Sequence, residues 1–233
     1  MLPLRDNLPT RRFPVLTVAL IVANVLVFAL YQGAGQGSSF FSSVDEFAFR
    51  PCEVEESCPT AGAGWLVTLF TAMFLHAGWL HLLGNMLFLW IFGNNVEDTL
   101  GRPRYIAFYV LGGVAAMATQ SAVTLGFGTQ ADASIPNLGA SGAISAVLGA
   151  YFVLFRHGRV LTYIFPIFIF PLPAFVFLGV YFVMQALVGG LSFVGAQESG
   201  GVRLLRAHRR HRLRHPHGAH FRRGPPAVEI LRT

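Results

Sequence analysis

Long apolar stretches separated by short polar segments make up most of the chain. The hydrocarbon core of a bilayer is ~30 Å thick, so a helix that crosses it needs ~20 mostly apolar residues. Five stretches of this kind are Phe13–Tyr31, Trp65–Phe92, Tyr105–Leu125, Leu138–Phe155 and Leu172–Leu191. The pattern predicts an all-α polytopic membrane protein with five recognisable transmembrane helices.

The composition supports this prediction. Of the 233 residues, 54% are hydrophobic and 12% are charged, whereas soluble domains carry roughly 25% charged residues. Such a chain has too few polar side chains to cover a water-soluble globule, and it is too apolar for a disordered protein. The first stretch is too long and too uninterrupted for a signal peptide, so we expect it to remain as an anchor.

The positions of the arginines predict the orientation of the spans. Basic residues in short loops favour the cytoplasmic side of a membrane. A cytoplasmic N-terminus, residues 1–12, places the segments 32–64 and 129–137 on the outer side. The arginines then predicted to lie on the cytoplasmic side, called here the arginine side, are Arg5, Arg11, Arg12, Arg102, Arg104, Arg156 and Arg159. This orientation predicts an integral protein of a bacterial-type inner membrane.

The outer segment 32–64 contains both cysteines of the chain, Cys52 and Cys58. They can pair if the segment faces an oxidising compartment, but a spacing of six residues is only permissive. The sequence therefore leaves the disulfide open.

A few polar residues lie inside the apolar stretches, where they are costly and usually functional. His81 and Asn85 are four residues apart and therefore share one helical face. Taken alone, they are typical of hydrogen bonds between helices, and the small residues Gly139–Gly142 are typical of close helix packing. The predicted orientation, however, puts both groups at the same outer level. A serine in the first turn of a helix lies near free N–H groups that favour an oxyanion. Imidazole and carboxamide donors opposite it complete an arrangement suited to acyl transfer.

These residues also resemble a known family. The segments His76-Ala-Gly-Trp-Leu-His-Leu-Leu-Gly-Asn85 and Gly139-Ala-Ser-Gly142 resemble the rhomboid intramembrane serine proteases. Supporting marks are Gly93-Asn-Asn-Val-Glu-Asp-Thr-Leu-Gly101, Leu172-Pro-Ala and Gln185. The resemblance covers about residues 13–202, which we take as one membrane domain.

The resemblance implies a six-helix bundle that cuts substrate transmembrane helices near their outer ends. The nucleophile of the family falls on Ser141 and its oxyanion-side residues fall on His81 and Asn85. His76, Gly139 and Gly142 are expected near the site. The expected partners are transmembrane-helix proteins and the lipid bilayer, with no nucleic acid, no cofactor and no metal.

The family's catalytic base is a histidine on a sixth span, in a pattern like Ala-His-x-x-Gly, and the sequence departs from the family here. Residues 203–233 carry nine arginines and one acid, Glu229, and cannot cross a bilayer. His208 is nearest in register to the expected base but has no helix to hold it. His157 follows Ser141 by 16 residues, or roughly 24 Å of helix, which excludes it. His81 could act as base in principle, but the family gives it a different role.

Three interpretations of this arginine-rich tail remain. It is a polybasic segment for anionic lipids, a nucleic-acid arm, or the product of a shifted reading frame. Both basic roles require the cytoplasmic side, whereas five spans place the tail outside. With suitable codons, a frame moved forward by one base reads 203–214 as Ala-Phe-Phe-Ala-His-Ile-Gly-Gly-Ile-Val-Phe-Gly. That reading contains the missing histidine pattern. If the frame is not shifted, we expect residues 203–233 to be a disordered tail.

Two functions follow from the sequence. The first is an intramembrane serine endopeptidase whose activity is impaired because the base is missing. The alternative is a catalytically inactive rhomboid-like protein that binds transmembrane helices. A transporter is disfavoured, because its polar groups would lie at mid-membrane, whereas this polar cluster lies at the outer edge.

Overall fold

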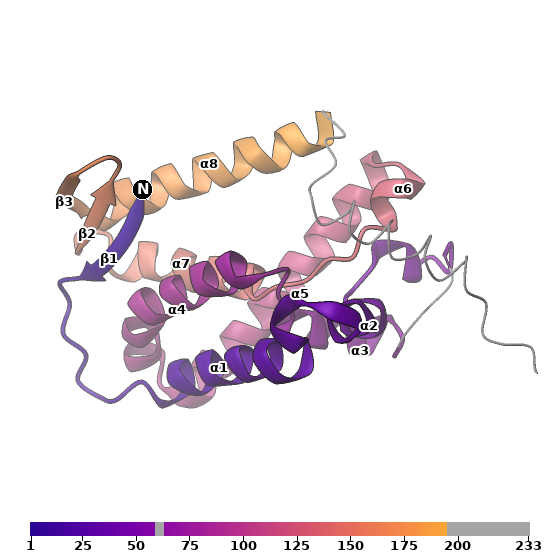
Figure 1. Ribbon diagram of the computed structural model, residues 1–233. Coiled ribbons are helices and arrows are strands. Elements are labelled where there is room, and N and C mark those ends of the chain that lie inside the picture. Colours follow the sequence, from indigo (N-terminus) through magenta and orange to yellow (C-terminus); the bar gives the residue numbers. More distant parts are fainter. Residues whose placement is uncertain (59–62, 195–233) are drawn as a thin grey trace, which may run out of the picture. The chain divides into compact units, whose positions relative to one another are not determined.

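The computed structural model describes residues 1–58 and 63–194, which belong to the first of two units of the chain, Met1–Gln197 (Figure 1). The arginine-rich tail, and with it His208, lies outside the described residues. The helices are α1 (Val15–Leu26, continued by a π-helical turn at Val27–Tyr31), α2 (Gly37–Phe47), α3 (Trp65–Thr71, continued by a 3-10 turn at Ala72–Phe74), α4 (Trp79–Leu100), α5 (Arg102–Phe127), α6 (Gln130–Ala133), α7 (Ser141–Leu154) and α8 (Ala174–Val194). The strands are β1 (Leu2–Asp6), β2 (Arg159–Ile164) and β3 (Phe168–Pro173).

A helix lies in each of the five predicted spans, but the boundaries differ. Among the described residues, only α5 is long and apolar enough by itself to cross a membrane. The segments Trp65–Phe74 and Trp79–Leu100 pass the same test as a pair, with an 81° bend between them. The continuous helix predicted over Trp65–Phe92 is therefore wrong at this bend. The other apolar helical segments among the described residues, Val15–Tyr31, Ser141–Leu154 and Ala174–Leu187, are shorter, so the number of spans stays a prediction.

The core forms where α7 packs against α4 and α5. Small residues allow the close approach of α5 and α7, since a Cβ on Gly112 would lie 2.4 Å from the Cβ of Ala146. A Cβ on Gly142 would lie 2.7 Å from the Cβ of Ala116 on α5. Packing of small residues is a usual way to join helices in a bilayer. It fixes the position of the N-terminus of α7, where Ser141 lies.

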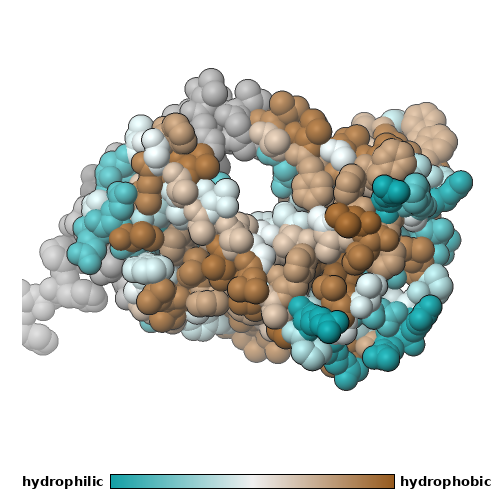
Figure 2. Space-filling view, turned by 180° about the vertical axis from the view of Figure 1, so that it is seen from behind, coloured by the Kyte–Doolittle hydropathy of each residue, from teal (hydrophilic) through white to brown (hydrophobic). Residues whose placement is uncertain are grey.

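The surface of the described unit is divided in the way expected for a membrane protein. Hydrophobic residues form broad areas along the helices, and hydrophilic residues gather near their ends (Figure 2). On α8, the side chains of Val183, Met184 and Leu187 are more than half exposed. Exposed apolar side chains of this kind are suited to lipid or to another transmembrane helix.

The all-α prediction is wrong in one respect, because β1, β2 and β3 form an antiparallel sheet in the order β1-β2-β3. β1 pairs with β2 from Leu2↔Tyr163 to Asp6↔Val160. The segment after α7 is rich in β-branched and aromatic residues, which favour strands. Its prolines 166, 171 and 173 disfavour a helix interior, so α8 begins at Ala174 and not at Leu172.

The sheet is joined to the helices through Asp6. Its Oδ2 accepts hydrogen bonds from Asn95 Nδ2 on α4, at 2.6 Å, and from the Tyr151 hydroxyl on α7, at 2.8 Å. Burial raises the pKa of this carboxyl above its ordinary value of 3.8, although the hydrogen bonds oppose the shift. Ionisation of Asp6 is therefore harder in the folded protein than in the unfolded chain.

This raised pKa predicts a pH dependence of stability. A group whose pKa is higher in the folded state stabilises the fold below the unfolded pKa, and this stabilisation is lost as pH rises through the folded pKa. We expect the thermal stability of the detergent-solubilised protein to fall as pH rises from about 4 towards 7. Asp6→Asn should flatten this slope, measured by thermal unfolding at each pH. An unchanged slope in the variant would contradict the assignment to Asp6.

On the outer segment, Cys52 and Cys58 form a disulfide with their Cα atoms 5.6 Å apart. The pairing that the sequence left open is therefore present in the structure. Nearby, Arg50 bridges Asp45 at 3.2 Å and Glu53 at 3.4 Å.

Candidate active site

The structure places the start of α7 against the first turns of α4. Gly139, two residues before α7 begins at Ser141, has a φ of +121°. A Cβ at Gly139 would lie 2.7 Å from His81 Cε1, 2.9 Å from His81 Nε2 and 3.7 Å from Asn85 Nδ2. A side chain here would be strained by the backbone and would collide with the imidazole. The two groups of polar residues identified in the sequence therefore meet, 54 residues apart from Asn85 to Gly139.

His76 holds the side chain of Asn85 in place. Its side chain is fully buried, and its Nε2 lies 3.0 Å from Asn85 Nδ2. A carboxamide nitrogen only donates, so Nε2 of His76 accepts and its ring proton lies on Nδ1. That Nδ1 has no hydrogen-bond partner among the described residues. The rings of His76 and His81 meet edge to face with centroids 5.1 Å apart.

A residue that the sequence interpretation missed fixes His76 in turn. Gln32 follows the π-helical turn after α1 and is fully buried. Its Nε2 donates to the His76 carbonyl at 3.1 Å, and its Oε1 accepts from the His76 amide at 2.8 Å. Two hydrogen bonds to the backbone of one residue, His76, hold the chain at the bend between α3 and α4. The only sequence signal was a glutamine at the end of an apolar stretch, and its partner is 44 residues away.

Ser141 is partly buried at the first position of α7. Its hydroxyl has no hydrogen-bond partner within the part of the chain that the structure describes. His157 lies beyond the opposite end of α7, where its Nε2 accepts from Arg156 Nε at 3.0 Å. Of the residues predicted for the site, His81, Asn85, His76, Gly139 and Gly142 surround the N-terminus of α7 or lie in it, and His208 is outside the described residues.

The electrostatic character of the site comes from neutral donors. Neither an acid nor an arginine lies in the segments 76–85 and 139–142. Within the described ranges there is no group of three or more metal-ligating side chains. The arrangement can offer an imidazole, a carboxamide and the free N–H groups of a helix N-terminus to a developing negative charge.

Comparisons with known proteins agree on one family. The Rhomboid domain model matches residues 63–196, more than half of the chain. Rhomboid protein 1, mitochondrial, of Saccharomyces cerevisiae is 34% identical over 154 residues, which is 65% of this chain and 40% of the yeast protein. RHOMBOID-like protein 12, mitochondrial, of Arabidopsis thaliana is 26% identical over 202 residues, 79% of this chain and 54% of that protein. Rhomboid protease GluP of Bacillus subtilis is 33% identical over 137 residues, 59% of this chain and 24% of the relative.

The matched regions span 24% to 54% of the length of these three relatives. Two of the relatives are mitochondrial and one is bacterial. The comparisons therefore do not support the expectation of a bacterial inner membrane in particular.

Proposed function

Because the chain belongs to the rhomboid family, whose members are integral membrane proteins and include proteases, we propose that its site is that of an intramembrane serine endopeptidase. Ser141 is the nucleophile, and His81 and Asn85 hold the oxyanion. The substrates are proteins with a transmembrane helix, cut near the membrane face opposite the arginine side. The observation that carries the proposal is the contact of Gly139 with His81 and Asn85, which sets the serine turn beside two donors.

The proposed chemistry follows from the positions of the donors. The Ser141 hydroxyl oxygen attacks the scissile carbonyl carbon, and its proton passes to a base. The carbonyl oxygen becomes an oxyanion, which accepts hydrogen bonds from Asn85 Nδ2, from His81 and from N–H groups of the first turn of α7. Loss of one such donor typically costs 10²–10³-fold in rate, roughly 3 to 4 kcal/mol. His76 keeps the Asn85 amide in place through the 3.0 Å contact.

The proposed site lacks an identified catalytic base among the described residues. A serine hydroxyl is a poor nucleophile without an adjacent base, and no described residue fills that role for Ser141. The sequence has nine arginines where the resemblance leads us to expect a span with a histidine. We therefore propose a protease site with low activity in the chain as given.

A fluorophosphonate probe tests the nucleophile, because it labels activated serines. We expect weak labelling of the detergent-solubilised chain that disappears in Ser141→Ala. Ser145→Ala is the matched control, since Ser145 lies one turn further along the same helix, and it should label like the parent chain. Labelling that survives in Ser141→Ala would contradict the assignment.

The absent base favours a second candidate, a rhomboid-like protein that binds transmembrane helices without cutting them. Its expected signature is no labelling at Ser141 while client helices still co-purify with the chain. The intact glycine and serine turn Gly139–Gly142 favours the protease.

A further inference from the structure

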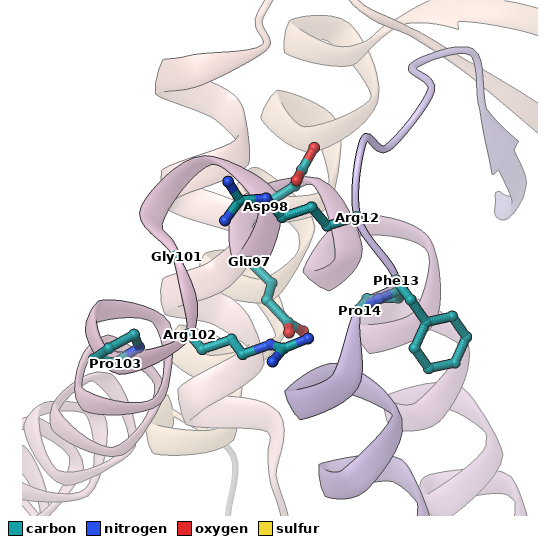
Figure 3. Close-up of a pocket in the computed structure, with 8 residues that line it drawn as sticks. All are labelled: Arg12, Phe13, Pro14, Glu97, Asp98, Gly101, Arg102 and Pro103. Carbon is teal, nitrogen blue, oxygen red and sulfur yellow. The ribbon is translucent and has the colours of Figure 1, made fainter.

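A pocket of about 460 Å³ opens at the arginine side, far in sequence from Ser141. Three segments form it: the chain before α1, the end of α4 and the start of α5 (Figure 3). Its lining residues are Arg12, Phe13, Pro14, Glu97, Asp98, Gly101, Arg102 and Pro103. Nothing in the proposed protease chemistry uses them.

Glu97, one of the two carboxylates of the pocket, already accepts hydrogen bonds from the protein itself. Glu97 is 4% exposed, and its oxygens accept from the backbone N–H groups of Leu16 at 3.0 Å and Thr17 at 2.8 Å. The Thr17 hydroxyl donates a third hydrogen bond at 2.8 Å. These donors belong to the first turn of α1, so the charge of Glu97 is balanced within the protein.

The other carboxylate remains available. Asp98 is partly exposed, and its Oδ2 accepts from the backbone N–H of Arg11 at 2.8 Å. Its second oxygen makes no hydrogen bond within the part of the chain that the structure describes. Asp98 can therefore accept a hydrogen bond from a cationic donor in the pocket.

The two arginines of the pocket have no partner among the residues that the structure describes. Neither guanidinium group, on Arg12 or Arg102, makes an ion pair or a hydrogen bond with the described residues, and both side chains are exposed. In Figure 3 they extend towards the end of α4 from opposite sides. Arg102 is also the first residue of the 26-residue helix α5, whose N-terminal N–H groups favour an anion.

The surroundings place this pocket at the level of lipid headgroups. α5 is long and apolar enough to cross a bilayer, and it starts at Arg102. Phe13 is 68% exposed, and Figure 3 shows its ring turned away from the charged groups. An exposed aromatic ring beside arginines at the end of a span is typical of the membrane interface. The anion abundant at that depth is the phosphate of a phospholipid.

We propose that this pocket binds the headgroup of a phospholipid that carries a free ammonium group, with phosphatidylethanolamine as its simplest form. The phosphate lies between Arg12 and Arg102, and the ammonium group donates to Asp98. Phosphatidylcholine offers the same phosphate but no N–H donor for Asp98. Phosphatidylglycerol brings no positive charge to this carboxylate, so the pocket distinguishes the three headgroups.

The test is native mass spectrometry of the full chain released from vesicles with equal amounts of phosphatidylethanolamine, phosphatidylcholine and phosphatidylglycerol. We expect phosphatidylethanolamine to be retained over both others. In the double variant Arg12→Gln/Arg102→Gln its retention should fall about tenfold, the effect of losing 1.4 kcal/mol of binding. The control Arg5→Gln/Arg159→Gln removes two charges from the sheet on the same side and should keep the preference.

Three results would overturn the proposal: equal retention of the three lipids, a preference for phosphatidylglycerol, or an unchanged preference in the double variant. If the double variant does not fold, Asp98→Asn decides, because it should bring the retention of phosphatidylethanolamine down to that of phosphatidylcholine. A thermal shift with inorganic phosphate alone distinguishes the source of the ligand. Stabilisation by free phosphate equal to that by the lipid would also count against a headgroup site.

Discussion

Reading the gene from codon 203 in the frame one base forward is expected to give a chain that cleaves transmembrane substrates at least about 10³-fold faster than the chain as given. Catalytic groups of a serine protease act as a unit, so a site without its base loses most of its rate and regains it when the base returns. In the shifted frame, residues 203–214 can be read as an apolar segment with the pattern Ala-His-x-x-Gly. This prediction has the largest expected effect because all other parts of the proposed site are present.

The described residues hold the other parts of the proposed site in place. The hydroxyl of Ser141 has no partner among the described residues, while Asn85 is already held by His76 and His76 by Gln32. Val183 and Met184 on α8 expose apolar surface against which a further helix can pack. In the shifted frame the arginines of residues 203–233 are read as other residues, so the conflict between a basic tail and the outer side of the membrane disappears.

The measurement is cleavage of a purified transmembrane substrate in detergent or vesicles, preceded by sequencing of the gene across codons 195–215. Two variants of the restored chain act as controls: Ser141→Ala, and alanine in place of the new histidine. Both should return to the level of the chain as given. Stop codons in the shifted frame would contradict the prediction. Cleavage by the restored chain that does not depend on its new histidine would also contradict it.

Sequence patterns predicted the parts of this fold that repeat along the chain. Apolar length located the helices, and the positive-inside distribution of arginines placed His81 and Gly139 at one level. The contact between them in the structure agrees with that placement. Local patterns were sufficient here because helix periodicity and loop charge are properties of neighbouring residues.

The parts that the sequence did not predict depend on distant partners. The bend between α3 and α4 is fixed by Gln32, 44 residues before His76. The strand β2 pairs with β1, which lies near the start of the chain. The strand β3 overlaps the predicted fifth span at Leu172. The apolar residues of the strands and of the span therefore looked like one continuous stretch. The residues of these pairs are too far apart in the sequence for a local pattern to reveal them.

Replacement of Glu97 by glutamine is expected to lower the free energy of unfolding by about 3 kcal/mol. Helix α1 begins after Pro14 and has no side-chain cap of its own, so its first N–H groups need acceptors from elsewhere. Glu97, 80 residues away, supplies them to Leu16 and Thr17. An amide keeps one acceptor oxygen but turns an NH₂ group towards donors, which leaves buried N–H groups unsatisfied at about 1–3 kcal/mol each.

The contribution of Glu97 can be separated from a general effect of charge removal by unfolding the detergent-solubilised protein with increasing denaturant. Asp98→Asn removes a neighbouring, more exposed carboxylate with a single backbone partner and should cost about 1 kcal/mol or less. Thr17→Val removes the hydroxyl that lies 2.8 Å from Glu97 Oε2 and 3.1 Å from the Tyr105 hydroxyl, and its cost should fall between the two. If Asp98→Asn cost as much stability as Glu97→Gln, the Glu97 carboxylate would be acting only through net charge. The graded order instead indicates that α4 serves as the N-terminal cap of α1. Glu97 would then fix the first helix to the helix that carries His81 and Asn85.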